Sequence, residues 1–385
     1  MIFNMDKRQI IIDNDGGTDD FVAIVYAFLS KKFDVKGITL VAGNTDVNNV
    51  KQNVFKSLEM AGVTPEEAKK VGIYLPENVN ENIISDGAQG DNGLGGVQFE
   101  YAKGYETNPE TAEEILAKTI NENPGQISIV ATGPLTNIAS VLEKNPDFVK
   151  NVDELIIMGG DEGGGNITPY AEFNIYQDPE AAKKVFEAGF KKITMIGFNI
   201  TKQITLCPEV EKFLKENGQD GNFIYDITRT TADLDRWKNK VDGASMNDIL
   251  TLLYLLKEDN MFKTKQADVD VDISQDETRG RTNIAEHEEG KSVCNIVTAA
   301  EGTPIIREML TTLFPGKEDE IEEALEGREL RIATRDYIIE TLPEMKERIL
   351  KIWNKEGAEK VMARAAEIAK QTLENRTKKS ESEGR

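Results

Sequence analysis

Apolar positions in the first half of the chain follow two alternating patterns. Short runs rich in β-branched residues predict strands at 9–13, 35–43, 126–132, 154–160 and 192–198. Between them, apolar residues recur with helical spacing over 19–30, 48–61, 111–121, 135–143 and 179–188. Apolar strands that alternate with helices are typical of a parallel sheet with both faces covered. We therefore predict an α/β fold with a mostly parallel, twisted sheet, in which ligands bind beyond the carboxyl ends of the strands.

The later part of the chain departs from this pattern. Residues 267–299 contain two strand-like segments around a turn at 276–283, which predicts a small antiparallel addition. Residues 303–314 are expected to form a helix that closes the domain. Beyond it, acidic and basic residues nearly balance, and single apolar stripes at helical spacing predict helices that pack on the domain or on a partner chain. We therefore expect a main domain over 1–316 and a helical C-terminal extension over 317–385 with a disordered tail.

Composition narrows the class of protein and its partners. Hydrophobic residues at 39% and charged residues at 30% describe an ordinary globular protein, and no apolar run approaches the length of about 20 residues that spans a membrane. The net charge of −22 argues against a nucleic-acid partner, because basic residues dominate contacts with phosphate. Cys207 and Cys294 have neither a disulfide framework nor metal-ligand spacing. Because the chain begins without the apolar segment of a signal peptide, we expect a cytoplasmic protein.

Four aspartates lie within the stretch "DNDGGTDD", where the first predicted strand leads into a helix. Asp13 and Asp15 would point to the same side of a strand, because side chains alternate there. Asp19 and Asp20 would open the helix, where the helix dipole favours carboxylates. Helix capping and solvated turn positions account for one or two of the four. A hard cation with oxygen ligands, calcium or magnesium, is the simplest way to neutralise the whole set.

Three further motifs accompany these aspartates: "VAGNTDVNN" (41–49), "ATGPLTNIASVL" (131–142) and "IMGGDEGGGNITPYAEFNIYQDPEAAKKVF" (157–186). Together with the opening motif, and with "TRGRT" at 278–282, they resemble the inosine–uridine-preferring nucleoside hydrolase family in order and approximate spacing, over roughly residues 8–315. The opening motif alone is also similar to that of haloacid-dehalogenase-like phosphatases, but no convincing second acidic pair and lysine accompany it. The resemblance implies an enzyme that hydrolyses the N-glycosidic bond of ribonucleosides to free base and ribose.

The resemblance also implies one calcium ion per chain. The family binds it through the second and fourth aspartates of the opening motif, which here are Asp15 and Asp20. The main-chain carbonyl of Thr136 and the carboxylate of Asp248 would be the other protein ligands, with water and ribose hydroxyls completing an oxygen shell. Asp15 would additionally act as the general base toward water at the calcium, and Asp13 as a supporting acid that orients its neighbours.

A ribose-binding set follows from the same resemblance. Its carboxylate and amide groups can hold sugar hydroxyls and stabilise an oxocarbenium-like transition state. The set comprises Asp19 and Asn174 for the 2′-hydroxyl, Asp248 for the 3′-hydroxyl, Asn166 and Glu172 for the 5′-hydroxyl, and Asn44 close to the metal. Without the resemblance, Asn166 is equally well a turn residue, and Glu172 and Asn174 alternate like solvated positions of a strand.

Two positions depart from the family pattern on the side of the leaving base. Asn247 directly precedes Asp248 where nonspecific members have a histidine, and Gln89 begins "QGDNGLGG" where the flap motif is often "HGxDGLGG". Neither amide can titrate and protonate a departing base as histidine does. His287, the only histidine of the chain, lies outside the matched motifs in "AEHEEG" and is expected in a solvated loop.

These departures leave three outcomes open for the function. The protein could cleave purine nucleosides whose base stacks on an aromatic side chain, with Trp237 and Tyr225 as candidates. It could act on a ribonucleoside whose base leaves without an acid. Alternatively, it could bind ribonucleosides with little or no turnover. In each case the expected partner is a small ribonucleoside, and the expected assembly is a homo-oligomer, a dimer or a tetramer.

Overall fold

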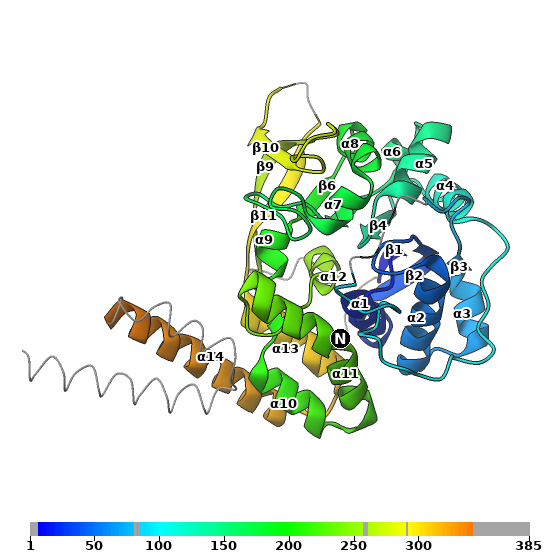
Figure 1. Ribbon diagram of the computed structural model, residues 1–385. Coiled ribbons are helices and arrows are strands. Elements are labelled where there is room, and N and C mark those ends of the chain that lie inside the picture. Colours follow the sequence, from blue (N-terminus) through cyan, green and yellow to red (C-terminus); the bar gives the residue numbers. More distant parts are fainter. Residues whose placement is uncertain are drawn as a thin grey trace, which may run out of the picture.

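A nine-stranded, mostly parallel sheet forms the centre of the computed structural model, which describes residues 7–80, 83, 85, 87–256, 261–289 and 292–341 (Figure 1). In the described residues the strand order is β10-β9-β11-β6-β5-β4-β1-β2-β3. The strands are β1 (Arg8–Asn14), β2 (Phe33–Leu40), β3 (Ile73–Tyr74), β4 (Ile127–Ala131), β5 (Leu155–Met158), β6 (Ile193–Ile196), β9 (Phe262–Val271), β10 (Thr282–Glu286) and β11 (Cys294–Ala300). The short strands β7 (Thr205–Leu206) and β8 (Ala244–Ser245) pair with each other in an antiparallel ladder outside this sheet.

Helices cover both faces of the sheet. One set comprises α1 (Thr18–Leu29), α2 (Val47–Met60), α3 (Pro65–Val71), α10 (Pro208–Glu216), α11 (Gly218–Leu234), α12 (Ile249–Leu256) and α13 (Gly302–Leu313). The other comprises α4 (Ala112–Glu122), α5 (Thr136–Lys144), α6 (Phe148–Asn151) and α8 (Pro179–Glu187). Strand β1 shows the division, because Ile10 and Ile12 belong to the first hydrophobic cluster and Ile11 to the second. This two-sided burial explains why the central strands have no polar face.

The predicted strands and helices of the first half are confirmed to within a few residues at their ends. The predicted antiparallel addition is also present, since β9 pairs antiparallel with both β10 and β11. It extends the main sheet rather than standing apart, because β11 pairs in parallel with β6. Helix α12 is apolar along nearly its whole length and has no polar face, because most of its side chains are buried.

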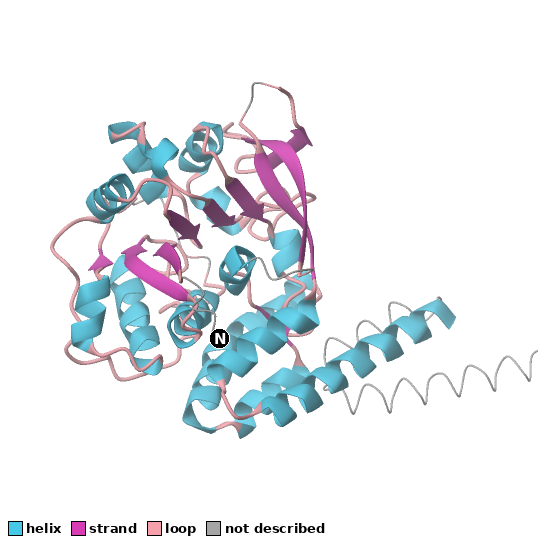
Figure 2. Ribbon diagram, turned by 180° about the vertical axis from the view of Figure 1, so that it is seen from behind, coloured by secondary structure: helices cyan, strands magenta, loops and turns pink. Residues whose placement is uncertain are grey.

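The C-terminal extension begins with α14 (Glu318–Thr341), which packs against α10 and α13. Ile321 and Leu325 of α14 are buried in the hydrophobic cluster of the main domain. Figures 1 and 2 show that α14 starts beside these two helices and then projects past the rest of the domain. The apolar stripes predicted beyond Thr341 lie outside the described residues, and the boundary after residue 316 stays a prediction. Among the helices that the structure describes, none combines the length and apolar character needed to cross a membrane.

Candidate active site

A cavity opens at the carboxyl ends of the parallel strands, as expected for this kind of sheet. Residues from the segments after β1, β2, β4, β5 and β6 all reach it. Its polar lining near the aspartate motif comprises Asp19, Asn44, Gln89, Thr132, Asn166, Glu172, Asn174, Asn247 and Asp248. It is also lined by Ala88, Met158, Phe173, Phe198, Thr231, Leu234, Asp235, Lys238 and Asn239. Most of the residues predicted from the motifs therefore meet at one place.

Three carboxylates converge beside this cavity. Ligand oxygens of Asp19, Asp20 and Asp248 lie within 4.8 Å of one another, and all three side chains are buried. Burial raises the pKa of Asp248, and the charges of Asp19 and Asp20 raise it further. Burial likewise raises the pKa of Asp20 well above its ordinary value, with the charge of Asp15 as the next cause. These carboxylates repel one another when ionised, and a bound hard cation would offset the repulsion because its positive charge stabilises the ionised forms.

Asp15 lies next to this group and is held by Asn44. Its Oδ2 accepts a hydrogen bond from the Asn44 main-chain N–H at 2.9 Å, and its Oδ1 accepts one from Nδ2 of Asn44 at 2.8 Å. Burial raises the pKa of Asp15 to about 7. Two glycines give the carboxylate its space, since a Cβ at Gly43 would lie 2.0 Å from Oδ2 and one at Gly133 would lie 2.8 Å from the Asp15 Cβ. Gly43 and Gly133, in the motifs at 41–49 and 131–142, therefore leave the space that the Asp15 side chain occupies.

Asp13 lies beneath the cavity without lining it. Its Oδ1 accepts hydrogen bonds from Thr39 Oγ1 at 2.6 Å and from Asn137 Nδ2 at 2.8 Å. Burial raises the pKa of Asp13 to about 7. The side chain ties β1 to β2 and to the start of α5, which agrees with a supporting position at the base of the site.

The structure places Thr132, and not Thr136, at the carboxylate group. Thr136 is half-buried, is absent from the cavity lining, and its hydroxyl donates to Asp178 at 2.7 Å. Thr132 follows the end of β4 and lines the cavity, and its hydroxyl donates to Oδ1 of Asp20 at 2.6 Å. Thr136 is the first residue of α5 and lies outside the cavity lining, and its main-chain carbonyl as a calcium ligand stays a prediction.

The segment around Glu172 forms a helix start and not a strand, so its strand-like interpretation is wrong. Glu172 is the N-cap of α7 (Phe173–Gln177), and its Oε2 accepts from the main-chain N–H groups of Gly160 and Ile175. Burial raises the pKa of Glu172 to about 7. Asn174 donates from Nδ2 to the carbonyl of Thr132 at 3.0 Å. The cap and this hydrogen bond orient both side chains at the cavity.

Asn166 reaches the same wall from the loop before α7. Its Oδ1 accepts a hydrogen bond from the main-chain N–H of Phe173 at 2.7 Å, and the side chain lines the cavity. Asn166 is therefore both a residue that stabilises its loop and a residue at the site.

Gln89 and Asn247, the two departures from the family pattern, both bind Asp19. Nε2 of Gln89 donates to Oδ1 of Asp19 at 3.0 Å, and Nδ2 of Asn247 donates to Oδ2 at 2.6 Å. Each amide is oriented in turn: Thr18 donates from its N–H to Oε1 of Gln89 at 2.9 Å, and Thr201 Oγ1 donates to Oδ1 of Asn247 at 2.7 Å. Burial raises the pKa of Asp19, while the two amides act in the opposite direction.

The aromatic platforms suggested by the sequence do not line the cavity. Trp237 is 71% exposed, because the π-helical turn η1 (Asp235–Asn239) directs its side chain to solvent. The ring of Tyr225 is covered by the Lys215 ammonium, 4.1 Å from its centroid. Phe198, in the short helix α9 (Phe198–Thr201), and Phe173 are the aromatic residues that line the cavity. The stacking role proposed for Trp237 is therefore not supported by its position.

The same π-helical turn contributes three cavity residues that the motifs did not reveal. Asp235, Lys238 and Asn239 line the cavity, and Asp235 is 4% exposed. Oδ2 of Asp235 accepts from the main-chain N–H of Ser245 at 2.8 Å, and burial raises the pKa of Asp235. None of the sequence motifs described above includes residues 235–239, so only the folded structure identifies them as cavity residues. His287, in contrast, lies at the end of the β10 strand, where its Nδ1 is 2.6 Å from Oδ1 of Asp268, outside the cavity lining.

Comparison with known proteins agrees with this site. The family model for inosine-uridine preferring nucleoside hydrolases matches residues 10–304. The chain is 34% identical over 287 residues to the pyrimidine-specific ribonucleoside hydrolase RihB of Escherichia coli O1:K1, an alignment that covers 72% of this chain and 87% of that protein. RihB of Escherichia fergusonii has the same identity and coverage.

Solved structures give the same assignment. A plant nucleoside hydrolase superposes with a TM-score of 0.73 at 27% identity, covering 80% of this chain and 99% of its own. A purine-preferring ribonucleoside hydrolase from Gardnerella vaginalis superposes with a TM-score of 0.71 at 25% identity, covering 81% and 99%. The fold, the buried aspartates and the family model agree, and the chain belongs to the inosine-uridine preferring nucleoside hydrolase family.

Proposed function

We propose that this nucleoside hydrolase is calcium-dependent and releases ribose and free base from ribonucleosides. The observation that carries the proposal is the buried group of acidic oxygens from Asp19, Asp20 and Asp248, with Asp15 beside it. Oxygen donors of this kind are those that calcium prefers. We assign one calcium ion per chain to Asp15, Asp20 and Asp248, with the main-chain carbonyl of Thr136 or an oxygen of Thr132 as a further ligand. When bound, calcium would neutralise these carboxylates and make a nearby water easier to deprotonate.

Asp15 is the proposed general base. Only its ionised form can accept a proton, and the two hydrogen bonds from Asn44 stabilise that form and fix its orientation. Asp15 directly follows the end of β1, beside the other carboxylates. The water that it activates would therefore approach the sugar from the side of the carboxylates. Asp13, bonded to Thr39 and Asn137, keeps the end of β1 in place beneath it.

The aspartate side of the cavity is the proposed ribose subsite. Asp19 and Asn174 are assigned to the 2′-hydroxyl, Asp248 to the 3′-hydroxyl, and Asn166 with Glu172 to the 5′-hydroxyl. Cleavage of an N-glycosidic bond develops positive charge on the sugar, as in other glycoside hydrolyses. The buried carboxylates of this wall stabilise that charge in a place shielded from water.

We assign the base to the part of the cavity near Gln89, Phe198 and Asn247, and the chemistry of these residues sets the preference. Gln89 and Asn247 are amides that do not titrate, so neither can protonate a departing base, and each donates a hydrogen bond to Asp19. We infer that the enzyme favours ribosides whose base leaves without protonation, such as cationic bases, or purines packed against Phe198, over uridine. General acid assistance is worth about 10²- to 10⁴-fold in rate, which is the handicap that uridine would face.

A parallel assay of ribose release tests this proposal. Nicotinamide riboside, 7-methylguanosine, inosine and uridine would be compared at equal enzyme concentration through kcat/KM. We expect at least one of the first three to exceed uridine. The highest kcat/KM with uridine would contradict the base preference, and binding of all four without ribose release would contradict the proposed turnover.

A cytoplasmic location and a homo-oligomer, a dimer or a tetramer, also remain proposals. The homo-oligomer is motivated by the apolar stripes that the sequence carries in its C-terminal extension. Light scattering on the purified full chain would give its mass directly, and fractionation of the producing cells would give its location.

A further inference from the structure

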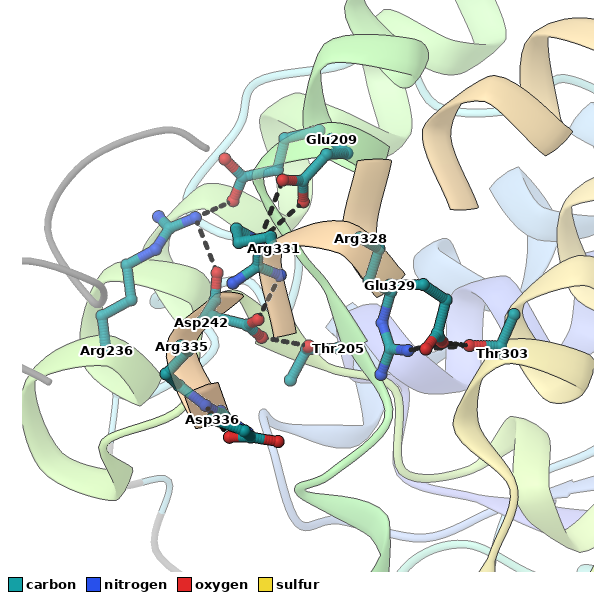
Figure 3. Close-up of polar contacts among 11 residues, drawn as sticks. Thr205, Glu209, Arg236, Asp242, Thr303, Arg328, Glu329, Arg331, Arg335 and Asp336 are labelled. Carbon is teal, nitrogen blue, oxygen red and sulfur yellow. Dashed lines mark hydrogen bonds and ion pairs between the residues drawn. The ribbon is translucent and has the colours of Figure 1, made fainter. Parts of the chain in front are cut away.

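The C-terminal helix α14 inserts one arginine into the main domain. The side chain of Arg331 is fully buried, and its Nε lies 2.9 Å and 3.0 Å from the two carboxylate oxygens of Glu209 in α10. Its Nη2 donates to Oδ2 of Asp242 at 2.5 Å (Figure 3). A fully buried guanidinium is retained only with well-placed acceptors, so these two carboxylates determine where α14 docks.

Asp242 belongs to the segment that leads into the active site. Its Oδ1 accepts a hydrogen bond from Thr205 Oγ1 in β7, and β8 follows two residues later and pairs with β7. The chain then continues through Asn247, which binds Asp19, to Asp248 at the carboxylate group. Gly243 permits close contact with β7, because a Cβ there would lie 2.0 Å from the carbonyl of Leu206. The Arg331–Asp242 pair therefore anchors the start of a segment whose end lies in the cavity.

The same anchor reaches the π-helical turn η1. Nη2 of Arg236, within this turn, pairs with Glu211 of α10 and lies 3.4 Å from the main-chain carbonyl of Asp242. Strand β8 contacts the same turn, because the main-chain N–H of Ser245 donates a hydrogen bond to Oδ2 of Asp235. Figure 3 shows Arg236, Asp242 and Arg331 side by side. The segments 235–239 and 245–248, which carry the cavity residues Asp235, Lys238, Asn239, Asn247 and Asp248, thus share one charged support beneath α14.

We propose that Arg331 is a positioning residue, through which the C-terminal helix holds these two segments of the cavity wall in register with the carboxylate group. This inference rests on the proposed function in one respect, since it takes the ribose to lie on the aspartate side. Loss of the guanidinium leaves Glu209 and Asp242 without their shared cation and frees the segment that carries Asn247. A small displacement of positioning groups can lower a rate by about 10²-fold.

Arg328 offers a matched control on the same helix. It is also buried, at 8% exposure, but its Nη1 donates to Thr303 Oγ1 of α13 at 2.9 Å and pairs with Glu329. Replacing Arg328 by Gln therefore removes a buried arginine of α14 but keeps the hydrogen bond between Arg331 and Asp242. Both Arg331→Gln and Arg328→Gln are expected to lower the thermal midpoint. Only Arg331→Gln is expected to change the cavity wall.

The test combines hydrogen exchange and kinetics on the full chain. We expect Arg331→Gln to raise amide exchange in 235–248 and to lower kcat/KM for the best nucleoside by about 10- to 10²-fold, with partial recovery in Arg331→Lys. Arg328→Gln should leave both measurements near wild type. Equal exchange and equal kinetics in the two Gln variants would overturn the proposal.

A second variant covers a failure of Arg331→Gln to fold. Asp242→Asn keeps the size of the side chain and removes its charge, and the same increase of exchange in 235–248 is expected; unchanged exchange there would overturn the proposal. The exchange measurement needs no turnover. If the wild type cleaves no nucleoside, the proposed function fails while the exchange result still decides whether Arg331 supports this wall.

Discussion

The side-chain amide of Asn247 donates a hydrogen bond to Oδ2 of Asp19 at 2.6 Å, although the two residues are 228 positions apart in the chain. Gln89 donates to the other oxygen of the same carboxylate. The two positions at which the family pattern has histidine are thus occupied by amides that orient one aspartate. An amide keeps its donor role at every pH, so the orientation of Asp19 does not depend on the titration of these two partners.

The first prediction concerns this hydrogen bond. Asn247→Asp would face the Asp19 carboxylate with a second acceptor, and repulsion would displace both. We expect kcat/KM for the best nucleoside to fall by about 10²-fold or more, the size of effect that a misplaced catalytic group produces. Thr201→Val, which removes only the hydroxyl that orients Asn247, should have a smaller effect of the same sign. A near-wild-type rate for Asn247→Asp would show that Asp19 does not need the hydrogen bond from Asn247.

The second prediction concerns the metal ligands. Asp20→Ala removes a carboxylate from the buried group, so the purified variant should retain much less than one calcium per chain in elemental analysis. Thr136→Val serves as the control, because the structure places that hydroxyl on Asp178 and outside the cavity. Full calcium occupancy in Asp20→Ala would refute the ligand assignment.

The third prediction concerns the role of Asp15. Asp15→Asn preserves the size of the side chain but removes the proton acceptor, so turnover should fall by about 10²-fold or more while ribose still binds. Turnover is measured by ribose release and binding by calorimetry with ribose. Turnover close to wild type, with binding intact, would assign the general base elsewhere.

The fourth prediction concerns pH and stability. Burial raises the pKa values of Asp13, Asp15 and Glu172 to about 7, whereas the same groups in an unfolded chain titrate near their ordinary values of about 4. Between these limits the metal-free folded state holds more protons than the unfolded state, so its free energy of unfolding decreases as the pH rises from about 4 to about 7.

Thermal unfolding in a chelator and in excess calcium, across this pH window, measures the effect. Calcium binds the folded state and competes with protons, so the gain in thermal midpoint should be larger at about pH 7.5 than at about pH 5. A chelated protein that becomes more stable over this window would contradict the pKa shifts.

The sequence predicted those parts of the fold and site that depend on local patterns. The opening motif placed Asp15, Asp19 and Asp20 correctly because a strand end, a glycine turn and a helix start lie within a few residues. The motif at 131–142 contains both Thr132 and Thr136, and the sequence predicts Thr136 as the ligand. The end of β4 and the start of α5 separate the two residues, and the hydroxyl that donates to Asp20 is that of Thr132.

Gln89 and Asn247 were predicted on the side of the base, but the residues of η1 could not be, because their place at the cavity depends on long-range contacts. Trp237 was predicted as a stacking platform for the base, but in the π-helical turn its side chain is exposed to solvent. The same turn places Asp235 and Lys238 at the cavity. The hydrogen bond from Asn247 to Asp19 joins segments from opposite ends of the domain. Neither arrangement leaves a periodic signal in the sequence.

The proposal that this enzyme needs calcium is tested by measuring ribose release with and without the metal. The wild-type protein would be freed of metal with a chelator and then titrated with calcium, while ribose release from its best nucleoside is followed. The account predicts that turnover disappears on chelation and returns in full as about one calcium per chain is bound, the occupancy expected of a single group of oxygen ligands. Undiminished turnover in a preparation shown by elemental analysis to be free of metal would contradict it.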